Sequence, residues 1–376
     1  MGYVAVQGGI SAIENAEQLS NYIRLKGRST PIGIKQIQDQ LRLLVDKIMS
    51  EGGLYSPFHA ALAIKQSEGD PVEAAFYIRA YRSTLCRIND SYPLDMNEMH
   101  ISRRISSTFK DIPGGQILGC TSDYKQRMLD FSLLDEGEKE MEEVVAEFEL
   151  KEEEGEDVSS VQFKKVVDIL KEQGLVKSLE RSQEQKNAEE ISDITKESVS
   201  FPASRSAQLQ MMARSETGGI LALAYSSMRG YGSIHPTIAE LRVGHVPVMI
   251  SHPFRKNESV YLGTVQVTET EIVAKYDSDG ADEKPYFTLG YGICFGANEV
   301  KSISMAVLDR AMKETEGKAP ANDQEFVLMH IDGIESSGFC AHFKLPHYIT
   351  FQSDLNNLRR TQEDQKQKSA EKEGSI

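Results

Sequence analysis

The amino-acid sequence predicts an α+β protein, in which a helical N-terminal region is followed by a mixed α+β region with an antiparallel sheet. Apolar residues between positions 34 and 48 recur at steps of three and four, which is the spacing of one helix face. After Phe201 the chain becomes rich in glycine and in alternating apolar residues, which is typical of strands. The length of 376 residues exceeds the usual size of one domain, so we expect two packed units plus linkers.

The helical region is assigned to residues 1–134. Its first expected helix carries the apolar face of residues 34–48, and Gly52-Gly53 ends it. A second helix, over residues 74–88, follows the start signal Asp70-Pro71-Val72-Glu73, which combines an N-cap acid, a first-turn proline and a Glu at the third helical position.

Residues 135–200 read as an acidic, partly disordered insertion with one short amphipathic stretch at residues 163–175. Residues 135–157 alone hold thirteen acids and two lysines, which accounts for most of the formal net charge of -15. The rest of the chain is therefore nearly balanced, and an extended surface for nucleic acid is disfavoured. An anionic ligand would have to be held by a local cluster of Arg and Lys.

Residues 201–355 form the expected α+β region. Strands are predicted at residues 246–250, 260–267 and 272–276, and helices begin at Asn298-Glu299 and at Asp323. Residues 356–376 lose their apolar content and are expected to be a frayed, charged tail.

Other classes of protein are excluded by simple features. No stretch approaches 18 consecutive apolar residues, which argues against a membrane protein. The start of the chain has no secretion signal, so a cytoplasmic location is expected. Four cysteines without a Cys-x-x-Cys pair predict neither a disulfide framework, an iron-sulfur cluster nor a zinc ribbon.

Two segments concentrate residues suited to anions. In the first, Arg103, Arg104 and Lys110 supply charge, and Gly114 and Gly115 would let backbone N–H groups approach a phosphate. The alternative is a Pro-Gly-Gly turn with solvated basic residues. The second segment follows an apolar stretch at residues 221–224 and contains Arg229, His235, Glu240 and Arg242, which suits anion binding and proton donation.

A third segment, at residues 287–296, contains Gly290-Tyr291-Gly292 but lacks the Lys-Ser/Thr of a P-loop, so close backbone packing explains it better. The fourth segment, at residues 325–348, places three histidines beside three acids. Its members of chemical interest are His330, Asp332, His342, Lys344 and His347. Packed or surface imidazoles are the alternative for each histidine.

Together these segments resemble the PhnI family, the I subunits of the carbon-phosphorus lyase complex that lets bacteria use phosphonates as a phosphorus source. The resemblance spans almost the whole chain. The motifs that carry it include Val45-Asp46-Lys47-Ile48-Met49, Arg103-Arg104-Ile105-Ser106, Lys110-Asp111-Ile112-Pro113-Gly114-Gly115-Gln116, Arg229-Gly230-Tyr231-Gly232, Gly290-Tyr291-Gly292 and Lys344-Leu345-Pro346-His347-Tyr348. The sequence departs from the family pattern at Leu289, where the family tends to have Arg, at Cys120, and in its long acidic segment.

The resemblance implies a transferase subunit of α-D-ribose 1-methylphosphonate 5-triphosphate synthase. In that reaction methylphosphonate displaces adenine from C1 of the ribose of ATP, and the I subunit alone resembles a purine nucleoside triphosphate nucleosidase. The implied partners are the G, H and J subunits, with L and K as ATP-binding-cassette-type proteins and a homodimer of this chain at the centre. Mg²⁺ would accompany the ATP. The alternative is a non-catalytic scaffold whose active site forms only with partner subunits.

Cleavage of an N-glycosidic bond needs a carboxylate near the sugar, a proton donor for the base and cations for the phosphates. The candidates are Glu240 or Asp332 for the carboxylate and His235 or His330 for the proton. Arg103, Arg104, Lys110, Arg229 and Lys344, with the backbone of Gly114 and Gly115, are the candidates for phosphate or phosphonate oxygens. Ordinary ion pairs are the alternative for each charged residue.

The pair His342 and His347 is the candidate metal site. Five residues apart, the two side chains lie on opposite faces of a strand and about 140° apart around a helix. Pro346 favours a bend that brings them together. The family resemblance implies that they bind a divalent metal, zinc first, near the junction with the J subunit. Two imidazoles do not complete a tetrahedral site, so further ligands are required.

Overall fold

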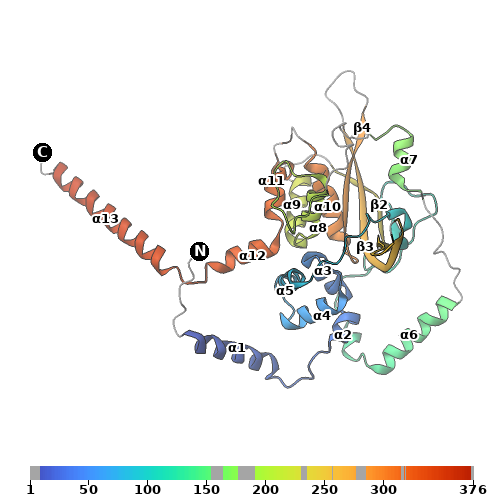
Figure 1. Ribbon diagram of the computed structural model, residues 1–376, viewed down its shortest axis with the longest axis horizontal. Helices are drawn as coiled ribbons and strands as arrows, with labels where there is room; N and C mark the ends of the chain where they lie inside the picture. Colours follow the sequence, from blue (N-terminus) through green and yellow to red (C-terminus); the bar gives the residue numbers. More distant parts are fainter. Residues whose placement is uncertain are drawn as a thin grey trace. The chain divides into compact units, whose positions relative to one another are not determined.

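The computed structural model describes residues 9–153, 164–176, 191–229, 235–255, 257–276, 285–314, 317 and 319–373. The chain divides into one large unit, residues 34–333, and a second unit made of residues 1–33 and 334–376. The helices of the second unit are α1 (Gly9–Leu25), α12 (Gly333–His342) and α13 (Tyr348–Glu373) (Figure 1). In the described part of the chain, no helix has both the length and the apolar character needed to cross a membrane.

The large unit is built on a four-stranded antiparallel sheet with the order β1-β2-β3-β4. The strands are β1 (His100–Ile105), β2 (Thr237–Ser251), β3 (Ser259–Tyr276) and β4 (Tyr286–Phe295). Leu241 of β2 lies opposite Thr270 of β3, which in turn lies opposite Gly292 of β4. The predicted antiparallel sheet and the α+β class are therefore confirmed, and the strands expected at 260–267 and 272–276 form one continuous strand.

One face of the sheet is covered by helices from the C-terminal half. They are α8 (Arg205–Ala213), α9 (Thr217–Met228), α10 (Glu299–Ala311) and α11 (Gln324–His330), and α10 contacts β4 most closely. A Cβ atom on Gly290 would collide with the carbonyl oxygen of Ala306, and one on Gly292 with that of Ser302. The two glycines therefore allow the helix backbone to lie directly on the strand, as expected from close packing and not from a nucleotide loop.

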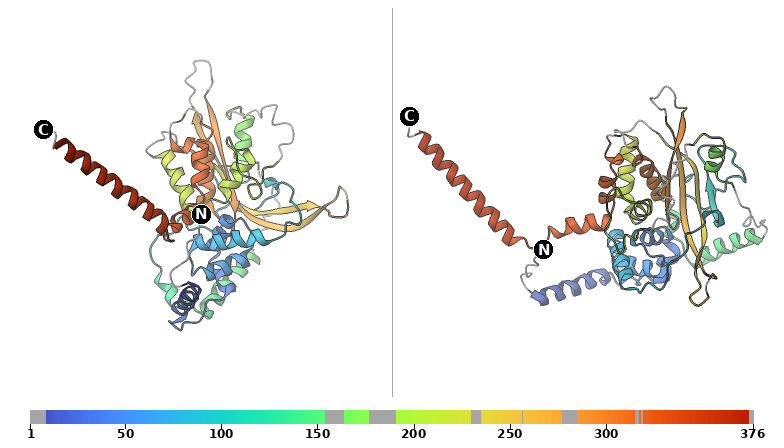
Figure 2. Two further views of the ribbon diagram at one scale, coloured as in Figure 1. Left: turned by 60° about the vertical axis from the view of Figure 1, so that its left-hand side comes forward. Right: turned by 45° about the horizontal axis from the view of Figure 1, so that its top comes forward.

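The opposite face is covered by α7 (Val166–Glu172), as both views of Figure 2 show. Val166, Val167 and Leu170 are buried against Ala239 and Val273 of the sheet. The amphipathic stretch of the acidic segment is thus part of the core. The expectation that the whole segment is an insertion outside the fold is wrong for this stretch. Its apolar residues are too few to be recognised as core from composition. Residues 154–163 and 177–190 of the segment lie outside the described residues.

The N-terminal helices are α2 (Ile34–Gln40), α3 (Arg42–Gly52), α4 (Pro57–Gln66) and α5 (Pro71–Thr84). The helix expected over residues 34–48 is divided at Leu41, and α3 ends where Gly53 adopts a left-handed conformation with φ of 69°. The start signal before α5 is confirmed, because the carboxylate of Asp70 accepts hydrogen bonds from the N–H groups of Val72 and Glu73, both at 2.9 Å.

Three elements correct the expected organisation. The region expected to be helical contributes β1, which pairs with β2 and so joins the two halves of the large unit. The acidic segment contains the helix α6 (Glu138–Glu153). The expected frayed tail continues as α13 to Glu373, because its residues are mostly strong helix formers even though they are polar.

Candidate functional site

The two histidines expected to share a metal lie at a bend between two helices. His342 is the last residue of α12, and His347 immediately precedes α13. Their ring centroids are 5.4 Å apart, with the ring planes at 57°. The bend predicted from Pro346 is confirmed, since neither regular element would bring these two side chains together.

Each of these imidazoles contacts, through Nδ1, the backbone carbonyl of a residue two or three positions earlier. Nδ1 of His342 lies on the carbonyl oxygen of Phe339, and Nδ1 of His347 lies 2.5 Å from that of Leu345. Metal-binding histidines are commonly oriented in this way, because a proton held on one ring nitrogen leaves the lone pair of the other for the metal. The arrangement fits two ligands of a zinc site. No group of three or more metal-binding side chains occurs among the described residues, and a tetrahedral site needs further ligands.

His330 and Asp332 lie close together in the sequence but in different environments. His330 ends α11, is exposed, and places Nδ1 2.7 Å from the carbonyl oxygen of Phe326. Asp332 is buried, with Oδ2 2.6 Å from Nη1 of Arg79 and 3.6 Å from Nε of Arg214. The imidazole is therefore accessible to a ligand, whereas the carboxylate is held between two arginines.

Arg103 and Arg104 are both buried in β1. Nε of Arg104 lies 2.5 Å from Glu240, and its other nitrogens donate to the carbonyl oxygens of Pro113, Gly115 and Lys164. Arg103 pairs with Asp123 at 2.5 Å and with Glu299 at 2.7 Å. These contacts favour a structural role for both side chains, and their binding of phosphate stays a prediction.

Glu240 joins three parts of the fold. One carboxylate oxygen pairs with Arg104 of β1, and the other accepts a hydrogen bond of 2.9 Å from the N–H of Val166, the first residue of α7. With only 2% of its surface exposed, Glu240 holds β1 and α7 to β2. A substrate would reach this carboxylate only after the contacts around it open.

The remaining candidates are exposed. Gly114 and Gly115 have positive φ angles of 81° and 76° in a turn whose carbonyl group faces Arg104, and Lys110 lies on the surface nearby. Arg229 follows the last residue of α9, with its guanidinium 5.9 Å from the ring centroid of Tyr225. His235 and Lys344 are also exposed, and residues 230–234 of the expected glycine-rich loop lie outside the described residues.

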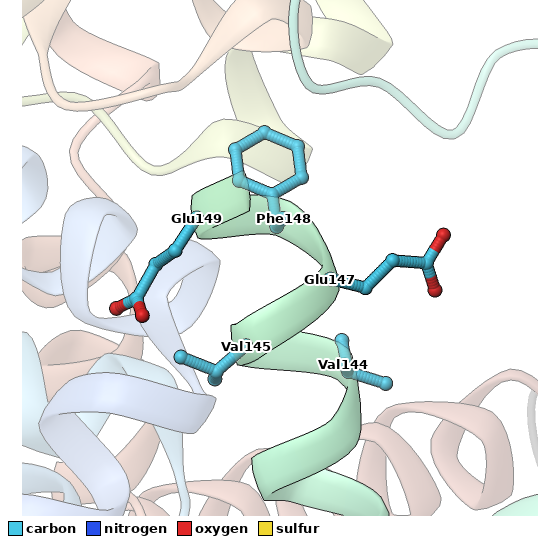
Figure 3. A pocket seen from close by; sticks show the side chains of 5 residues that line it. All are labelled: Val144, Val145, Glu147, Phe148 and Glu149. Atoms are coloured by element: carbon cyan, nitrogen blue, oxygen red, sulfur yellow. The ribbon is translucent and has the colours of Figure 1, made fainter. Parts of the chain in front are cut away.

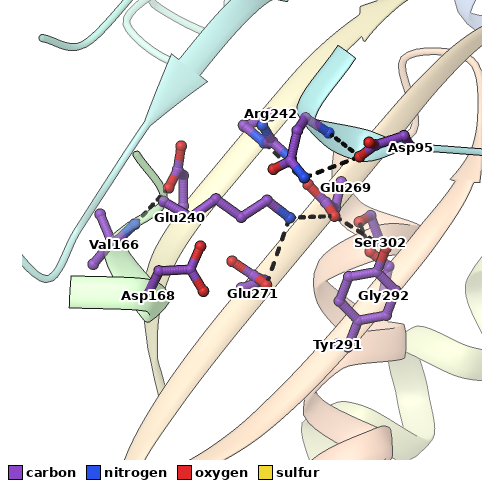
Figure 4. Close-up of polar contacts among 12 residues, drawn as sticks. Asp95, Val166, Asp168, Glu240, Arg242, Glu269, Glu271, Tyr291, Gly292 and Ser302 are labelled. Atoms are coloured by element: carbon purple, nitrogen blue, oxygen red, sulfur yellow. Dashed lines mark hydrogen bonds and ion pairs between the residues drawn. The ribbon is translucent and has the colours of Figure 1, made fainter. Parts of the chain in front are cut away.

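A polar cluster not expected from the sequence lies on the α7 face of the sheet (Figure 4), with Arg242 and Glu269 buried and Lys165, Glu271 and Tyr291 partly buried. Nζ of Lys165 lies 2.9 Å from Glu269 and 3.8 Å from Glu271. Glu269 also accepts hydrogen bonds from Nε of Arg242 and the hydroxyl of Tyr291, both at 3.0 Å. The alternation Glu-Leu-Arg at 240–242 and Glu-Thr-Glu at 269–271 was a signal, but such alternation normally marks a solvent-exposed face.

The two glutamates of β3 titrate differently. Burial opposes ionisation of Glu269, but the positive charges of Arg242 and Lys165 outweigh it and hold its pKa below the ordinary value. Burial dominates at Glu271 and raises its pKa to about 7, with only Lys165 and Arg242 opposing the shift. Burial and the neighbouring Glu269 also raise the pKa of Tyr291. Glu271 is therefore a carboxyl group that exchanges a proton near neutral pH.

A surface hollow lies along α6 and is lined by Val144, Val145, Glu147, Phe148 and Glu149 (Figure 3). All five residues come from one helix, and the sticks point in different directions around its axis. Ligand sites usually bring polar groups together from several elements. The hollow is therefore the side of a single helix and not a candidate ligand site.

The fold and the bend define a class: an α+β protein in which a bend between two helices brings two histidines together. A family model described as "Bacterial phosphonate metabolism protein (PhnI)" matches residues 2–365, so the chain belongs to the PhnI family. The resemblance found in the sequence is thereby confirmed.

Three relatives match nearly the whole chain. A protein of Stutzerimonas stutzeri named putative C-P lyase subunit protein HtxH is 50% identical over 375 residues, which covers 96% of each chain. The protein of Escherichia coli K12 named alpha-D-ribose 1-methylphosphonate 5-triphosphate synthase subunit PhnI is 44% identical over 368 residues, covering 96% of this chain and 99% of its own. A protein of the same name from Rhizobium meliloti 1021 is 43% identical over 363 residues, covering 95% and 94%.

Proposed function

We propose that this chain is a subunit of α-D-ribose 1-methylphosphonate 5-triphosphate synthase in the carbon-phosphorus lyase pathway. The observation that carries this proposal is similarity over nearly the whole chain to two proteins named as subunits of that synthase. In the reaction an oxygen of methylphosphonate bonds to C1 of the ribose of ATP as the bond from C1 to the base breaks. Adenine leaves with the bonding electron pair and takes up a proton.

The chain offers groups for each requirement of this step. The transition state at C1 resembles an oxocarbenium ion, so a nearby carboxylate stabilises it, and a general acid protonates the departing base. His330 and His235 are accessible proton donors. Glu240 and Asp332 are the candidate carboxylates near the sugar, and both are buried and paired with arginines, so each would have to open its ion pair to reach a substrate. Lys110, Arg229 and Lys344 are accessible cations for phosphate or phosphonate oxygens.

We also propose that His342 and His347 hold a divalent metal ion, zinc first, at a junction with the J subunit. The spacing of the rings and the contacts of both Nδ1 atoms support this proposal. When bound, such an ion supplies Lewis-acid stabilisation of phosphate or phosphonate oxygens. Lys344, between the two histidines in the sequence, would add a positive charge at the same bend. Mg²⁺ would accompany ATP.

The proposed assembly is a homodimer of this chain with G, H and J subunits, joined by L and K, in the cytoplasm. Large apolar side chains on the C-terminal helices and the turn between them support a role in assembly, since Phe339, Phe343 and Phe351 are each about two-thirds exposed. The same observation favours the second candidate function, a scaffold that is catalytic only together with its partners.

The test is to incubate the purified chain with ATP and Mg²⁺ and to measure free adenine by chromatography. Release that survives extensive purification, and that falls at least about tenfold in His330→Gln, supports a nucleosidase with His330 as proton donor. His252→Gln, in the hairpin between β2 and β3, is the matched control and should release adenine at the wild-type rate. Adenine that appears only after partner subunits are added supports the scaffold.

A further inference from the structure

Three arginines from two helices meet in the large unit. Arg79 and Arg82 are three residues apart on α5, so their side chains leave the same face of that helix. Arg214 follows the last residue of α8. Nη2 of Arg79 donates hydrogen bonds to the carbonyl oxygen of Arg214 at 3.3 Å and to that of Glu51 at 3.0 Å. These bonds fix Arg79 against the end of α8.

The guanidinium groups of Arg79 and Arg214 converge on one atom. Both approach Oδ2 of Asp332, at 2.6 Å and 3.6 Å, so two positive charges share one carboxylate oxygen. A pair of arginines around a single oxygen is the arrangement with which proteins also hold the oxygens of phosphate groups.

Arg82 adds a third positive charge to this group. In the described part of the chain no carboxylate lies within ion-pair distance of Arg82, and Nη1 donates to the carbonyl oxygen of Gly53 at 3.3 Å. Burial lowers the pKa of Arg82, and the like charges of Arg214 and Arg79 lower it further, while Asp193, whose own ion pair is with Arg87, opposes this shift from a greater distance. Neutralising the buried carboxylate of Asp332 accounts for the positions of Arg79 and Arg214. It does not account for a third guanidinium group, that of Arg82, close to the other two.

The group is open to solvent. The side chains of Arg79 and Arg214 keep 16% and 19% of their surface exposed, and Arg82 is partly exposed as well. Partial burial strengthens the attraction to an anion, because water screens it less than at a fully exposed site. An anion can therefore enter from solvent and still be bound in a poorly screened position.

We propose that Arg79, Arg82 and Arg214 form a binding site for a tetrahedral oxyanion, a phosphate or phosphonate group. Arg82 supplies the guanidinium donors beyond the one that Gly53 accepts, while Arg79 and Arg214 supply charge from positions fixed by Asp332. The choice of this ligand class rests on the proposed function, in which both a triphosphate and a phosphonate are substrates.

Binding is tested by calorimetry on the full chain with three probes: tripolyphosphate, methylphosphonate and inorganic phosphate. We expect Arg82→Gln to raise the Kd of the tightest probe about tenfold, because charge-assisted hydrogen bonds are lost. Arg255→Gln removes the same charge from the exposed hairpin and should leave Kd unchanged. Tighter binding of tripolyphosphate assigns the site to the nucleotide, and tighter binding of methylphosphonate assigns it to the phosphonate. Equal Kd values in both variants, or no binding of any probe, overturn the proposal.

A second measurement does not depend on how the variant folds. Wild-type chain is treated with phenylglyoxal, which modifies accessible arginines, and the modified residues are located by mass spectrometry. Tripolyphosphate should protect Arg82 and not Arg255, and equal modification of Arg82 with and without the anion overturns the proposal. Adenine release is measured separately, with and without the partner subunits. Anion binding that depends on Arg82, with no adenine release even when the partners are present, would refute the proposed function and leave this site standing.

Discussion

The polar residues of the sheet and those of the bend at His342 and His347 both form hydrogen bonds, but their partners lie at different distances along the chain. Arg104 and Glu240 are almost completely buried, and each makes hydrogen bonds to backbone groups of other segments as well as to its partner. Nδ1 of His342 and Nδ1 of His347 contact carbonyl groups two or three residues away, and the two rings otherwise contact each other and neighbouring aromatic rings. The helix that His342 ends, α12, has no buried side chain. The comparison teaches that side chains whose hydrogen bonds join distant segments hold the fold, whereas those with local partners are available to a ligand.

The largest effect is expected from Arg104→Ala. It leaves the carboxylate of Glu240 buried without its partner, which costs about 3–5 kcal/mol. Urea denaturation followed by circular dichroism measures this loss. Lys35→Ala, which breaks the exposed pair of Lys35 and Asp39, is the control and should cost no more than about 1 kcal/mol. Equal losses in the two variants would show that Arg104 does not hold the sheet.

A smaller, pH-dependent effect is expected from Glu271→Gln. Because the folded protein raises the pKa of Glu271 to about 7, it binds more protons than the unfolded chain between the ordinary value of 4.5 and pH 7. The stability that this group contributes is therefore complete below pH 4.5 and is lost as the pH rises through 7. Relative to wild type, the variant should gain about 2 kcal/mol between pH 5 and pH 8.

Urea denaturation at both pH values measures this gain. Glu258→Gln, an exposed glutamate of the hairpin, should show no such trend. A difference between wild type and Glu271→Gln that stays constant from pH 5 to pH 8 would contradict the raised pKa.

The double variant His342→Ala/His347→Ala should change the free energy of unfolding by less than about 0.5 kcal/mol, because both rings have only local contacts. We expect the variant to assemble with its partners but to lose metal and to fail to support growth on methylphosphonate. Elemental analysis of the assembled complex and a growth assay measure these outcomes. Normal zinc content together with normal growth would refute the metal site.

The smallest effect is expected from deleting residues 136–157. Between Glu138 and Glu149 no side chain of α6 is buried, and Met141, Val144 and Phe148 are all more than half exposed. Folding and adenine release should therefore stay close to wild type. Thermal denaturation and the adenine assay measure both properties. A fall of several degrees in melting temperature together with lost activity would show that the segment is docked.

The parts of the fold that sequence analysis predicted are those with local signals. Asp70 and Asp323 cap their helices through side-chain hydrogen bonds to residues two or three positions away, so the information lies within one turn. The bend at Pro346 is local in the same sense, and it was sufficient to place His342 beside His347.

The parts that were missed depend on distant partners. From the sequence, Arg103 and Arg104 are expected to bind an anion or, as the alternative, to be solvated. In the structure both are buried in β1, where they pair with Glu299 and Glu240. The partner of Arg79 cannot be recognised locally either, because Asp332 lies more than 250 positions away. The spacing of apolar residues along the sequence predicts helices, strands and their buried faces. It does not predict which distant residue will pair with a given charged side chain in the folded protein.

The pairing of β1 with β2 also determines which part of the chain can tolerate insertions and deletions. Ile105 lies opposite Leu241, so the whole acidic segment falls inside the loop that this pairing closes. The entropy cost of closing a flexible loop rises only with the logarithm of its length, by about 0.6 kcal/mol for each doubling. The connection through α6 is therefore a place where residues can be added or removed at little thermodynamic cost, and where a fluorescent or affinity label can be inserted while Arg104 still meets Glu240.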